Sequence, residues 1–416
     1  RYAVFRAALW TMVVSVSVAC ARGASPLAPV VKPGIEVWAE RGFAPLAGKR
    51  IGLITNPTGV TSDLRSTIDV LHAAKEVRLV ALFGPEHGVR GDVFAGKAVA
   101  DFRDEKTGVP VYSLYGKTHK PTPGMLKDLD ALVYDIQDIG SRSYTYINTM
   151  GAAMEAAAEN DLDFVVLDRP NPLGGEKMEG RPLDPRFRSG VGRYPIPYVY
   201  GMTCGELAQM INGEGWLQDG RRCRLHVIPM EGWERSMWFD DTGLPWVMTS
   251  PHVPTAETAF LYQATGILGE LHVVCEGVGY TLPFHLLGAP WLDGDTLLRD
   301  LASRRLPGVR FRPLTFTPYY YEHKDQTCRG VQIYITDRRS VELTPIQFHV
   351  MDIVRRRYPD RKLFGTGRDR MFDQVCGTDL IRRAFLDGKS IDEILAIWRE
   401  GVEDFRSRRA KYRLYR

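Results

Sequence analysis

Between residues 48 and 229, short apolar runs alternate with segments whose composition favours helix. The apolar runs occupy residues 50–55, 77–83, 109–114, 130–136, 163–167 and 224–228. Segment 66–74, the segment after Pro123 and segment 144–160 lie between them and contain residue types typical of helices. Strands that are apolar along their whole length and are separated by helices are typical of a parallel sheet covered on both faces. The pattern predicts an α/β fold with a Rossmann-like open parallel sheet domain over residues 34–238.

The pattern changes after about residue 240. A turn-rich stretch at 242–254 precedes a predicted helix at 256–268 and an aromatic, proline-rich section that extends to Pro318. Further strands are predicted at 309–316 and 330–336, and further helices at 345–358 and 391–405. We therefore expect a second, smaller α+β C-terminal domain over residues 239–416. We interpret its arginine-rich end, 406–416, as a solvated helix end rather than a site for an acidic partner.

Residues 1–24 have the features of a secretory signal. Arg1 and Arg6 precede an apolar run at 7–19 that is too short to span a bilayer comfortably. Cys20 stands in an imperfect lipoprotein cleavage box, so a lipid anchor at Cys20 is one alternative and a non-cleaved N-terminal anchor is another. We expect a periplasmic or secreted protein, either free or as a lipoprotein. We expect no membrane span in the mature chain, because no second apolar stretch approaches the roughly 20 residues required.

The composition is that of an ordinary globular protein, with 416 residues, 44% apolar and 25% charged. Lys and Arg number 54 against 50 Asp and Glu, and the resulting charge of +4 is too small to indicate a nucleic-acid partner. The first strand is followed by NPTG at 56–59 rather than by the GxGxxG of dinucleotide-binding domains. The cysteines are scattered and form no CxxC pair, so we expect no metal centre and no cofactor.

Acidic and cationic side chains end or follow three of the predicted strands. Glu86 lies in the GPEHG segment 84–88, after the strand at 77–83. The later strands are followed by Asp135, Gln137, Asp138, Arg142, Asp168, Arg169 and Asn171. Any one carboxylate could cap the next helix. Ligands of open α/β sheets bind beyond the carboxyl ends of the strands, so the coincidence of three such ends predicts a site there.

Paired acids on opposing loops suit glycoside hydrolysis, in which a carboxylic acid protonates the leaving oxygen while a second group attacks the sugar or activates water. Glu86 is the candidate acid, because the tight turn around it would hold its side chain in the cleft. His87 is expected to orient Glu86 or to bind sugar, with a purely structural role as the alternative. Tyr144 and Tyr146 offer aromatic and hydroxyl contacts to a sugar, and core packing is the competing interpretation.

Several long motifs occur in one order along the chain: GKRIGLITNPTGV, LVALFGPEHGVRGD, LVYDIQDIGSRSYTYI, VVLDRPNPLGG and EGRPLDPRFRS. From about residue 48 almost to the C-terminus, the sequence resembles the bacterial exo-β-N-acetylmuramidase (NamZ-like) family, formerly described only as a domain of unknown function. The resemblance implies a glycosidase that releases N-acetylmuramic acid from the non-reducing ends of peptidoglycan fragments, in a cleft closed by the C-terminal domain. Glu86, Asp138 and Glu276 are then the expected catalytic carboxylates. The expected substrate-binding residues are Asn56, His87, Asp135, Gln137, Arg142, Tyr144, Tyr146, Asp168, Arg169, Asn171, Arg181 and His252.

The chain departs from this family pattern at some positions. His252 stands where the family commonly has Asn, and Val278 and Leu282 replace two arginines. These losses leave open an alternative, a non-catalytic or altered-specificity cell-wall saccharide-binding paralogue. A planar guanidinium is well shaped to grip the lactyl carboxylate of muramic acid with two hydrogen bonds. We expect that role for one of three arginines, Arg142, Arg169 or Arg181.

A third hypothesis is a metal-dependent acyl or amide hydrolase that uses His87, Asp135 and Asp138. It requires sensitivity to chelators. No HExxH, GxSxG or SxxK motif supports it.

Overall fold

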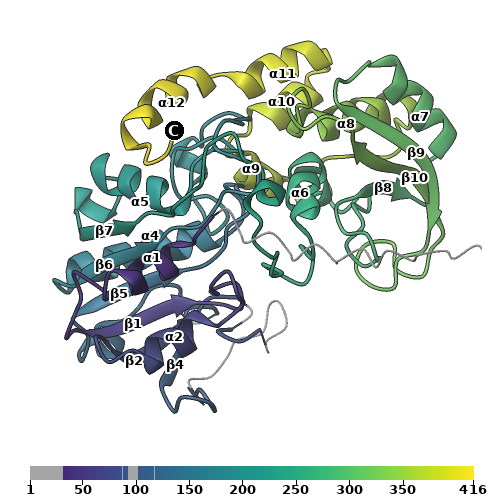
Figure 1. Cartoon of the computed structure of the whole chain (residues 1–416). Helices are drawn as coiled ribbons and strands as arrows, with labels where there is room; N and C mark the ends of the chain where they lie inside the picture. Colours follow the sequence, from purple (N-terminus) through teal and green to yellow (C-terminus); the bar gives the residue numbers. More distant parts are fainter. Residues whose placement is uncertain (1–30, 87, 92–101, 117) are drawn as a thin grey trace, which may run out of the picture.

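A computed structural model describes residues 31–86, 88–91, 102–116 and 118–416. The described chain forms two lobes (Figure 1), one built on a seven-stranded sheet and the other on a three-stranded sheet. The prediction of an α/β domain followed by a smaller α+β domain is confirmed. The expected secretory signal, 1–24, and Cys20 lie outside the described residues.

The large sheet contains every strand predicted for the first domain. Its strands are β1 (Arg50–Thr55), β2 (Arg78–Gly84), β3 (Phe102–Arg103), β4 (Pro110–Ser113), β5 (Ala131–Asp135), β6 (Asp163–Leu167) and β7 (Arg224–Ile228). They lie in the order β3-β4-β2-β1-β5-β6-β7, and each neighbouring pair is parallel except β3 with β4. The chain builds outward from β1 to β2 and β4 and returns to β5 on the other side of β1. The topological switch therefore lies between β1 and β5.

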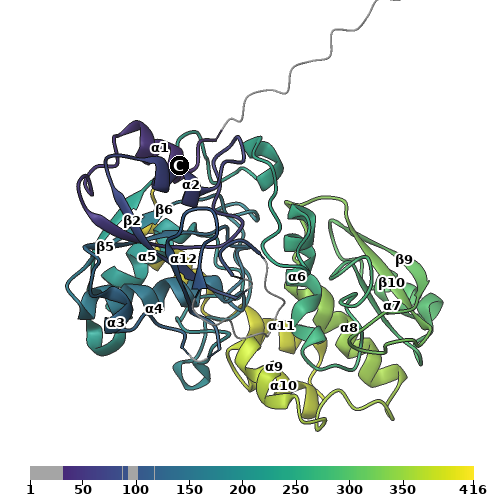
Figure 2. The ribbon, with the colours of Figure 1, turned by 90° about the horizontal axis from the view of Figure 1, so that it is seen from below.

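Helices cover both faces of this sheet. They are α1 (Gly34–Glu40), α2 (Thr67–Ala73), α3 (Pro123–Leu126), α4 (Tyr146–Glu159) and α5 (Cys204–Gly213). Figure 2 shows α1 and α2 on one side of the sheet and α3 and α4 on the other. Within β5, Leu132 and Tyr134 join the core under α4 and α5, whereas Val133 joins the core under α1 and α2. Because side chains alternate along a strand, an unbroken apolar run buries both faces of the sheet.

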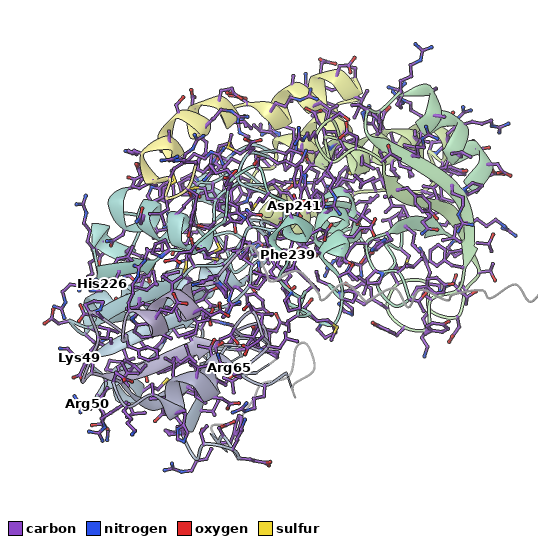
Figure 3. The ribbon with its side chains drawn as sticks, in the orientation of Figure 1. Lys49, Arg50, Arg65, His226, Phe239 and Asp241 are labelled. Carbon is purple, nitrogen blue, oxygen red and sulfur yellow. The ribbon has the colours of Figure 1, made fainter. Side chains whose placement is uncertain are left out.

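The carboxyl ends of the parallel strands point toward the second lobe. In Figure 3, Lys49 and Arg50, at the amino end of β1, lie at the outer edge of the first lobe. Phe239 and Asp241, from the segment that joins the lobes, lie beside the second lobe in the same view. The edge of the sheet at which ligands bind in open α/β folds therefore faces the junction of the two lobes.

The second lobe pairs an antiparallel sheet, in the order β8-β10-β9, with a group of helices. Its elements are α6 (Ala256–Gly269), β8 (Leu286–Ala289), α7 (Gly294–Ser303), β9 (Val309–Phe316), β10 (Cys328–Ile335), α8 (Thr344–Arg357), α9 (Asp369–Cys376), α10 (Leu380–Leu386) and α11 (Ile391–Arg399). Within the ranges that the structure describes, no helix is both long enough and apolar enough to cross a membrane.

The last helix departs from the expected domain boundary. α12 (Val402–Arg409) lies over the first lobe (Figure 1), where Val402 and Phe405 join the core formed with α4 and α5. Arg409 is buried and donates hydrogen bonds to the backbone carbonyls of Gly175 and Gly201. The interpretation of this arginine-rich end as solvated is therefore wrong for Arg409, because its guanidinium fastens the C-terminal segment to the first lobe.

Candidate active site

At the switch point, Asp135 and Arg169 are brought together and bind each other. The Arg169 guanidinium donates to both Asp135 oxygens, from Nε at 2.5 Å and from Nη2 at 3.0 Å, and both side chains are buried. Thr67 Oγ1 donates to the same carboxylate at 2.5 Å, and Arg169 Nη2 also donates to the carbonyl of Val60. These contacts fasten the loops after β1, β5 and β6. The two charges face each other, and Arg169 also lines a small pocket with Gln137 and Thr58, so their contact with a substrate stays a prediction.

The residues after β6 are also structural. Asp168 is fully buried and accepts hydrogen bonds from Thr203 Oγ1 (2.7 Å), the Gly205 amide (2.8 Å) and Tyr415 Oη (2.5 Å). It therefore ties the start of α5 to the C-terminal segment, and burial raises its pKa to about 6. Asn171 accepts from the Leu173 amide and donates to a backbone carbonyl in the same region. At this strand end the hydrogen bonds of Asp168 match the helix-capping alternative, and the predicted substrate contacts of Asp168 and Asn171 stay a prediction.

Asp138 occupies a buried position behind the switch point. Its Oδ2 accepts hydrogen bonds from the Gly140 amide at 2.6 Å and from Tyr200 Oη, while its Oδ1 has no hydrogen-bond partner within the described parts of the chain. Burial raises the pKa of Asp138 to about 6. Gln137 donates to the carbonyls of Asp138 (2.8 Å) and Pro170 (2.7 Å), which holds this loop against the one after β6.

Glu86 is the predicted carboxylate that reaches an open cavity. It follows β2, and its side chain is half-buried. Tyr115 and His119 line a cavity of about 560 Å³ with it, the start of α4 forms the floor, and residues 188–193 form the opposite wall. Its volume falls in the usual range for small-ligand sites, about 300–1,000 Å³. Among the described residues, Glu86 is the one carboxylate on the wall of this cavity.

Two tyrosines connect Glu86 to Asp138. Tyr146 Oη donates to the carbonyl of Thr249 at 2.5 Å, Tyr144 Oη donates to Thr249 Oγ1 at 2.8 Å, and the two rings meet edge to face. Burial raises the pKa of Tyr146, and the charges of Glu86 and Asp138 add to the rise. The phenol of Tyr146 therefore lies within electrostatic reach of both carboxylates. Asp138 itself does not line the cavity, so its predicted catalytic role has no direct geometric support here and stays a prediction.

Asn56 supports the same region from the end of β1. Its Oδ1 accepts hydrogen bonds from the amide (3.0 Å) and the hydroxyl (2.5 Å) of Thr58. Its Nδ2 is buried and makes no hydrogen bond within the described ranges. The Asn56 amide nevertheless lies close to Tyr146 and opposes the rise in the pKa of that tyrosine. Asn56 thus shapes the loop beneath the two tyrosines.

The predicted arginines lie elsewhere. Arg142 is fully buried and donates to four backbone carbonyls, those of Arg181, Ile196, Val375 and Cys376. Burial lowers the pKa of this guanidinium to about 10. Arg181 pairs with Glu400 near the C-terminal helices. None of Arg142, Arg169 and Arg181 lines the cavity of Glu86, so this cavity gives no support to the prediction that one of the three grips a substrate carboxylate.

Two arginines that sequence reasoning missed do line the cavity. Arg193 pairs with Glu155 at 2.7 Å, whereas Arg188 is exposed and makes no side-chain hydrogen bond or ion pair with any residue that the structure describes. Asn148 Nδ2 donates to the carbonyl of Gly190 at 2.7 Å and so ties this loop to α4. The available signal was the end of the EGRPLDPRFRS motif, which contains Arg188.

Of the remaining predicted residues, His252 and Glu276 do not line this cavity. His87 lies outside the described residues. His252 contacts the ring and hydroxyl of Tyr320, with Nε2 3.0 Å from Oη. Glu276 is buried inside the second lobe against Gly269, where a Cβ would come within 2.8 Å of the carboxyl carbon. Burial raises the pKa of Glu276 to about 8, so it is largely uncharged at neutral pH, and its catalytic role stays a prediction.

Within the described residues, the same loops offer little for metal binding. Across the part of the chain that the structure describes, no group of three or more His, Cys, Asp or Glu side chains could hold a metal ion. Since Asp135 is bound to Arg169 and His87 is outside the described residues, two of the three side chains invoked for the metal-dependent hydrolase give that hypothesis no geometric support.

Two regions of one protein family match this chain, one after the other. Residues 51–257 match the family described as "Exo-beta-N-acetylmuramidase NamZ, N-terminal", and residues 260–415 match its C-terminal counterpart. The chain is 47% identical over 388 residues to the "Peptidoglycan beta-N-acetylmuramidase NamZ" of Bacillus subtilis (strain 168), covering 93% of this chain and 92% of that protein.

Two solved structures of DUF1343 family proteins from Bacteroides fragilis NCTC 9343 have the same fold. One is 52% identical with a TM-score of 0.89, the other 32% identical with a TM-score of 0.74, and each comparison covers 93% of this chain and 99% of the other. With both family regions matched in order, the chain belongs to the NamZ exo-β-N-acetylmuramidase family.

Proposed function

We propose that this protein hydrolyses the terminal β-N-acetylmuramyl linkage of peptidoglycan fragments and releases N-acetylmuramic acid from the non-reducing end. The observation that carries the proposal is the half-buried Glu86 carboxyl on the wall of a sugar-sized cavity at the carboxyl edge of the sheet. Membership of the NamZ family and the peptidoglycan muramidase activity named for the Bacillus subtilis relative support the choice of substrate.

Glu86 acts as the general acid in this proposal. Its carboxyl proton passes to the glycosidic oxygen as the bond from that oxygen to the anomeric carbon breaks. A water molecule then supplies a hydroxyl group to the anomeric carbon, and the proton that this water loses restores the acid form of Glu86. The phenol of Tyr115 lies within hydrogen-bond reach of the carboxyl, and Tyr146 lies within its electrostatic reach. Asp138 acts from behind Tyr146 and positions the loop that carries the two tyrosines.

Arg188 is the residue that we assign to the lactyl carboxylate of muramic acid. Arg188 lines the same cavity as Glu86, whereas the neighbouring Arg193 is already paired with Glu155. A guanidinium can bind a carboxylate through two parallel hydrogen bonds. This assignment replaces the three arginines expected from the sequence.

The test compares chromogenic N-acetylmuramyl and N-acetylglucosaminyl glycosides. Wild type should cleave the muramyl substrate, and Glu86→Gln should lower kcat by about 10²–10⁴ while binding of the released sugar persists. Arg188→Ala should lower kcat/KM for the muramyl substrate by about tenfold or more and leave the glucosaminyl value little changed. Arg186→Ala is the matched control, because Arg186 is exposed, pairs with Asp184 and does not line the cavity.

The alternative, a saccharide-binding paralogue without turnover, is decided by the same assay. It is motivated by Val278 and Leu282, which stand in place of family arginines and lie in the second lobe. Sugar binding by the wild type with no release of chromophore, and with no effect of Glu86→Gln, would replace the hydrolase proposal with the binding one.

We also propose that the protein works outside the cytoplasm, either free or lipidated at Cys20. The charged and apolar pattern of residues 1–20 and the location of a peptidoglycan substrate support this proposal. Fractionation of cells that express the chain with its own N-terminal segment tests it. Retention of all the protein in the cytoplasm would refute it, and loss of membrane association in Cys20→Ala would identify the lipid anchor.

A further inference from the structure

Three consecutive tyrosines are exposed on the second lobe. Tyr319, Tyr320 and Tyr321 lie in the connection between β9 and β10, and their exposed fractions are 62%, 49% and 50%. Large aromatic side chains usually bury their rings in a core, so three in succession on a surface indicate a contact surface.

The connection is built to hold one conformation. The Asp325 amide donates to the carbonyl of Pro318 at 2.9 Å, which closes the loop, and the Tyr319 amide donates to the carbonyl of Gly279 at 2.7 Å. Gly279 has φ +91°, and a Cβ there would lie 1.9 Å from the carbonyl oxygen of Tyr320. Only glycine therefore allows this backbone approach. Tyr321 itself has φ 68°, a conformation that costs free energy and persists when the surrounding contacts impose it.

Two of these tyrosines, Tyr319 and Tyr320, each pack against a second aromatic ring. Tyr319 stacks on Tyr280, with ring centroids 5.8 Å apart and an interplanar angle of 29°. Tyr320 stacks on His252 at 6.2 Å with the same angle, and its hydroxyl lies 3.0 Å from His252 Nε2. Since each of these tyrosines packs against one neighbour and is still about half exposed or more, ring surface and hydroxyl edge remain open to a ligand. We call Tyr280, Tyr319, Tyr320 and His252 the aromatic platform.

The platform is connected to the active-site region by a short stretch of chain. His252 is three residues from Thr249, which accepts hydrogen bonds from both Tyr144 and Tyr146. Three residues span at most about 11 Å. His252 also precedes α6, which lies at the boundary between the two lobes in Figures 1 and 2. The platform thus adjoins the lobe junction on the second-lobe side.

We propose that the aromatic platform binds the pyranose rings of the glycan that follow the terminal sugar held beside Glu86. The proposal rests on the proposed function, because it concerns the part of the same substrate that leaves. The C–H face of a sugar ring packs on an aromatic face while its hydroxyls bond to phenol oxygens, and the exposed Tyr319 and Tyr320 offer both. Glu322, Lys324 and Asp325 flank it with mixed charge, which does not favour an anionic lipid surface as the ligand.

The test measures affinity against glycan length in the Glu86→Gln background, where turnover does not interfere. Calorimetric titration with peptide-free glycan fragments of one, two and four sugars should show affinity rising with length. Tyr320→Ala should make the gain in affinity from short to long fragments about tenfold smaller. Tyr320→Phe, which keeps the ring, should retain most of that gain. Tyr334→Ala is the matched control, since Tyr334 is 41% exposed but lies on β10, within the sheet. Thermal melts confirm that each variant is folded.

Equal length dependence in Tyr320→Ala and Tyr334→Ala would overturn the inference. Failure of the proposed function is a separate outcome. If the wild type shows platform-dependent binding of long fragments but never releases a sugar from them, the hydrolase proposal fails and the platform stands. If it releases N-acetylmuramic acid and Tyr320→Ala leaves the gain with length intact, the hydrolase proposal stands and the platform fails.

Discussion

Replacement of Arg142 by methionine tests whether this guanidinium is a clamp between the lobes rather than a substrate contact. Its side chain is fully buried, and it donates at 2.7–3.0 Å to carbonyls of both lobes. Val375 and Cys376 are the last two residues of α9, so Arg142 satisfies carbonyls that the helix itself leaves unpaired. Methionine preserves much of the side-chain length but leaves four acceptors without this donor.

The expected loss follows from these contacts. A hydrogen bond to a charged group contributes about 1.5–3 kcal/mol, and such values are not additive within one network. Removal of one member of a buried charged network typically costs about 3–5 kcal/mol. With an unfolding entropy near 2.1 cal/mol/K per residue, a chain of 416 residues should then lose about 3–6 °C in melting temperature.

The assay is thermal unfolding followed by circular dichroism, with Arg181→Met as the matched control. Arg181 pairs with the exposed Glu400, so its loss should change stability by less than about 1 kcal/mol. Arg142→Met should keep its preference for muramyl over glucosaminyl substrates at temperatures where it is folded. An Arg142→Met melting temperature equal to that of Arg181→Met, or a selective loss of the muramyl preference, would refute the reasoning.

Three further outcomes are expected. Burial raises the pKa of Glu276 from 4.5 to about 8, so its contribution to stability is fully present below pH 4.5 and is lost as pH rises from there to about 8. Glu276→Gln should flatten that loss in urea titrations between about pH 4.5 and 8 and leave kcat unchanged, and a kcat loss as large as that of Glu86→Gln would contradict its placement. Burial raises the pKa of Asp138 to about 6, so the free energy of unfolding should fall as pH rises from about 4 to 6. Asp138→Asn should remove up to about 3 kcal/mol of that fall. A variant whose stability depends on pH as steeply as the wild type would count against the buried carboxyl. Tyr415→Phe removes a donor to buried Asp168 and should destabilise by about 1–3 kcal/mol, as measured by the urea midpoint, whereas no shift would show that the C-terminal segment is not held there.

The pattern of apolar residues was sufficient for the sheet. All strands expected in the first domain occur, because an unbroken apolar run such as Leu132–Tyr134 has one stable solution, burial on both faces of a parallel sheet. The motifs were likewise sufficient to identify the family, because several long segments match in the same order even where single residues differ. β8 and α7 were not predicted, because the aromatic and proline-rich section around them carries no clear period.

Only the tertiary structure decided which strand-end side chains face the cavity. Sequence places Glu86, Asp135 and Asp168 alike at the ends of strands, but their partners come from far along the chain: Arg169 is 34 residues from Asp135, and Tyr415 is 247 residues from Asp168. A carboxylate that finds a buried partner is withdrawn from the surface, because its desolvation must be balanced by hydrogen bonds. Glu86 makes no ion pair with a described residue and lies beside the phenol of Tyr115, which lines the same cavity, and that difference arises from contacts distant in sequence rather than from local pattern.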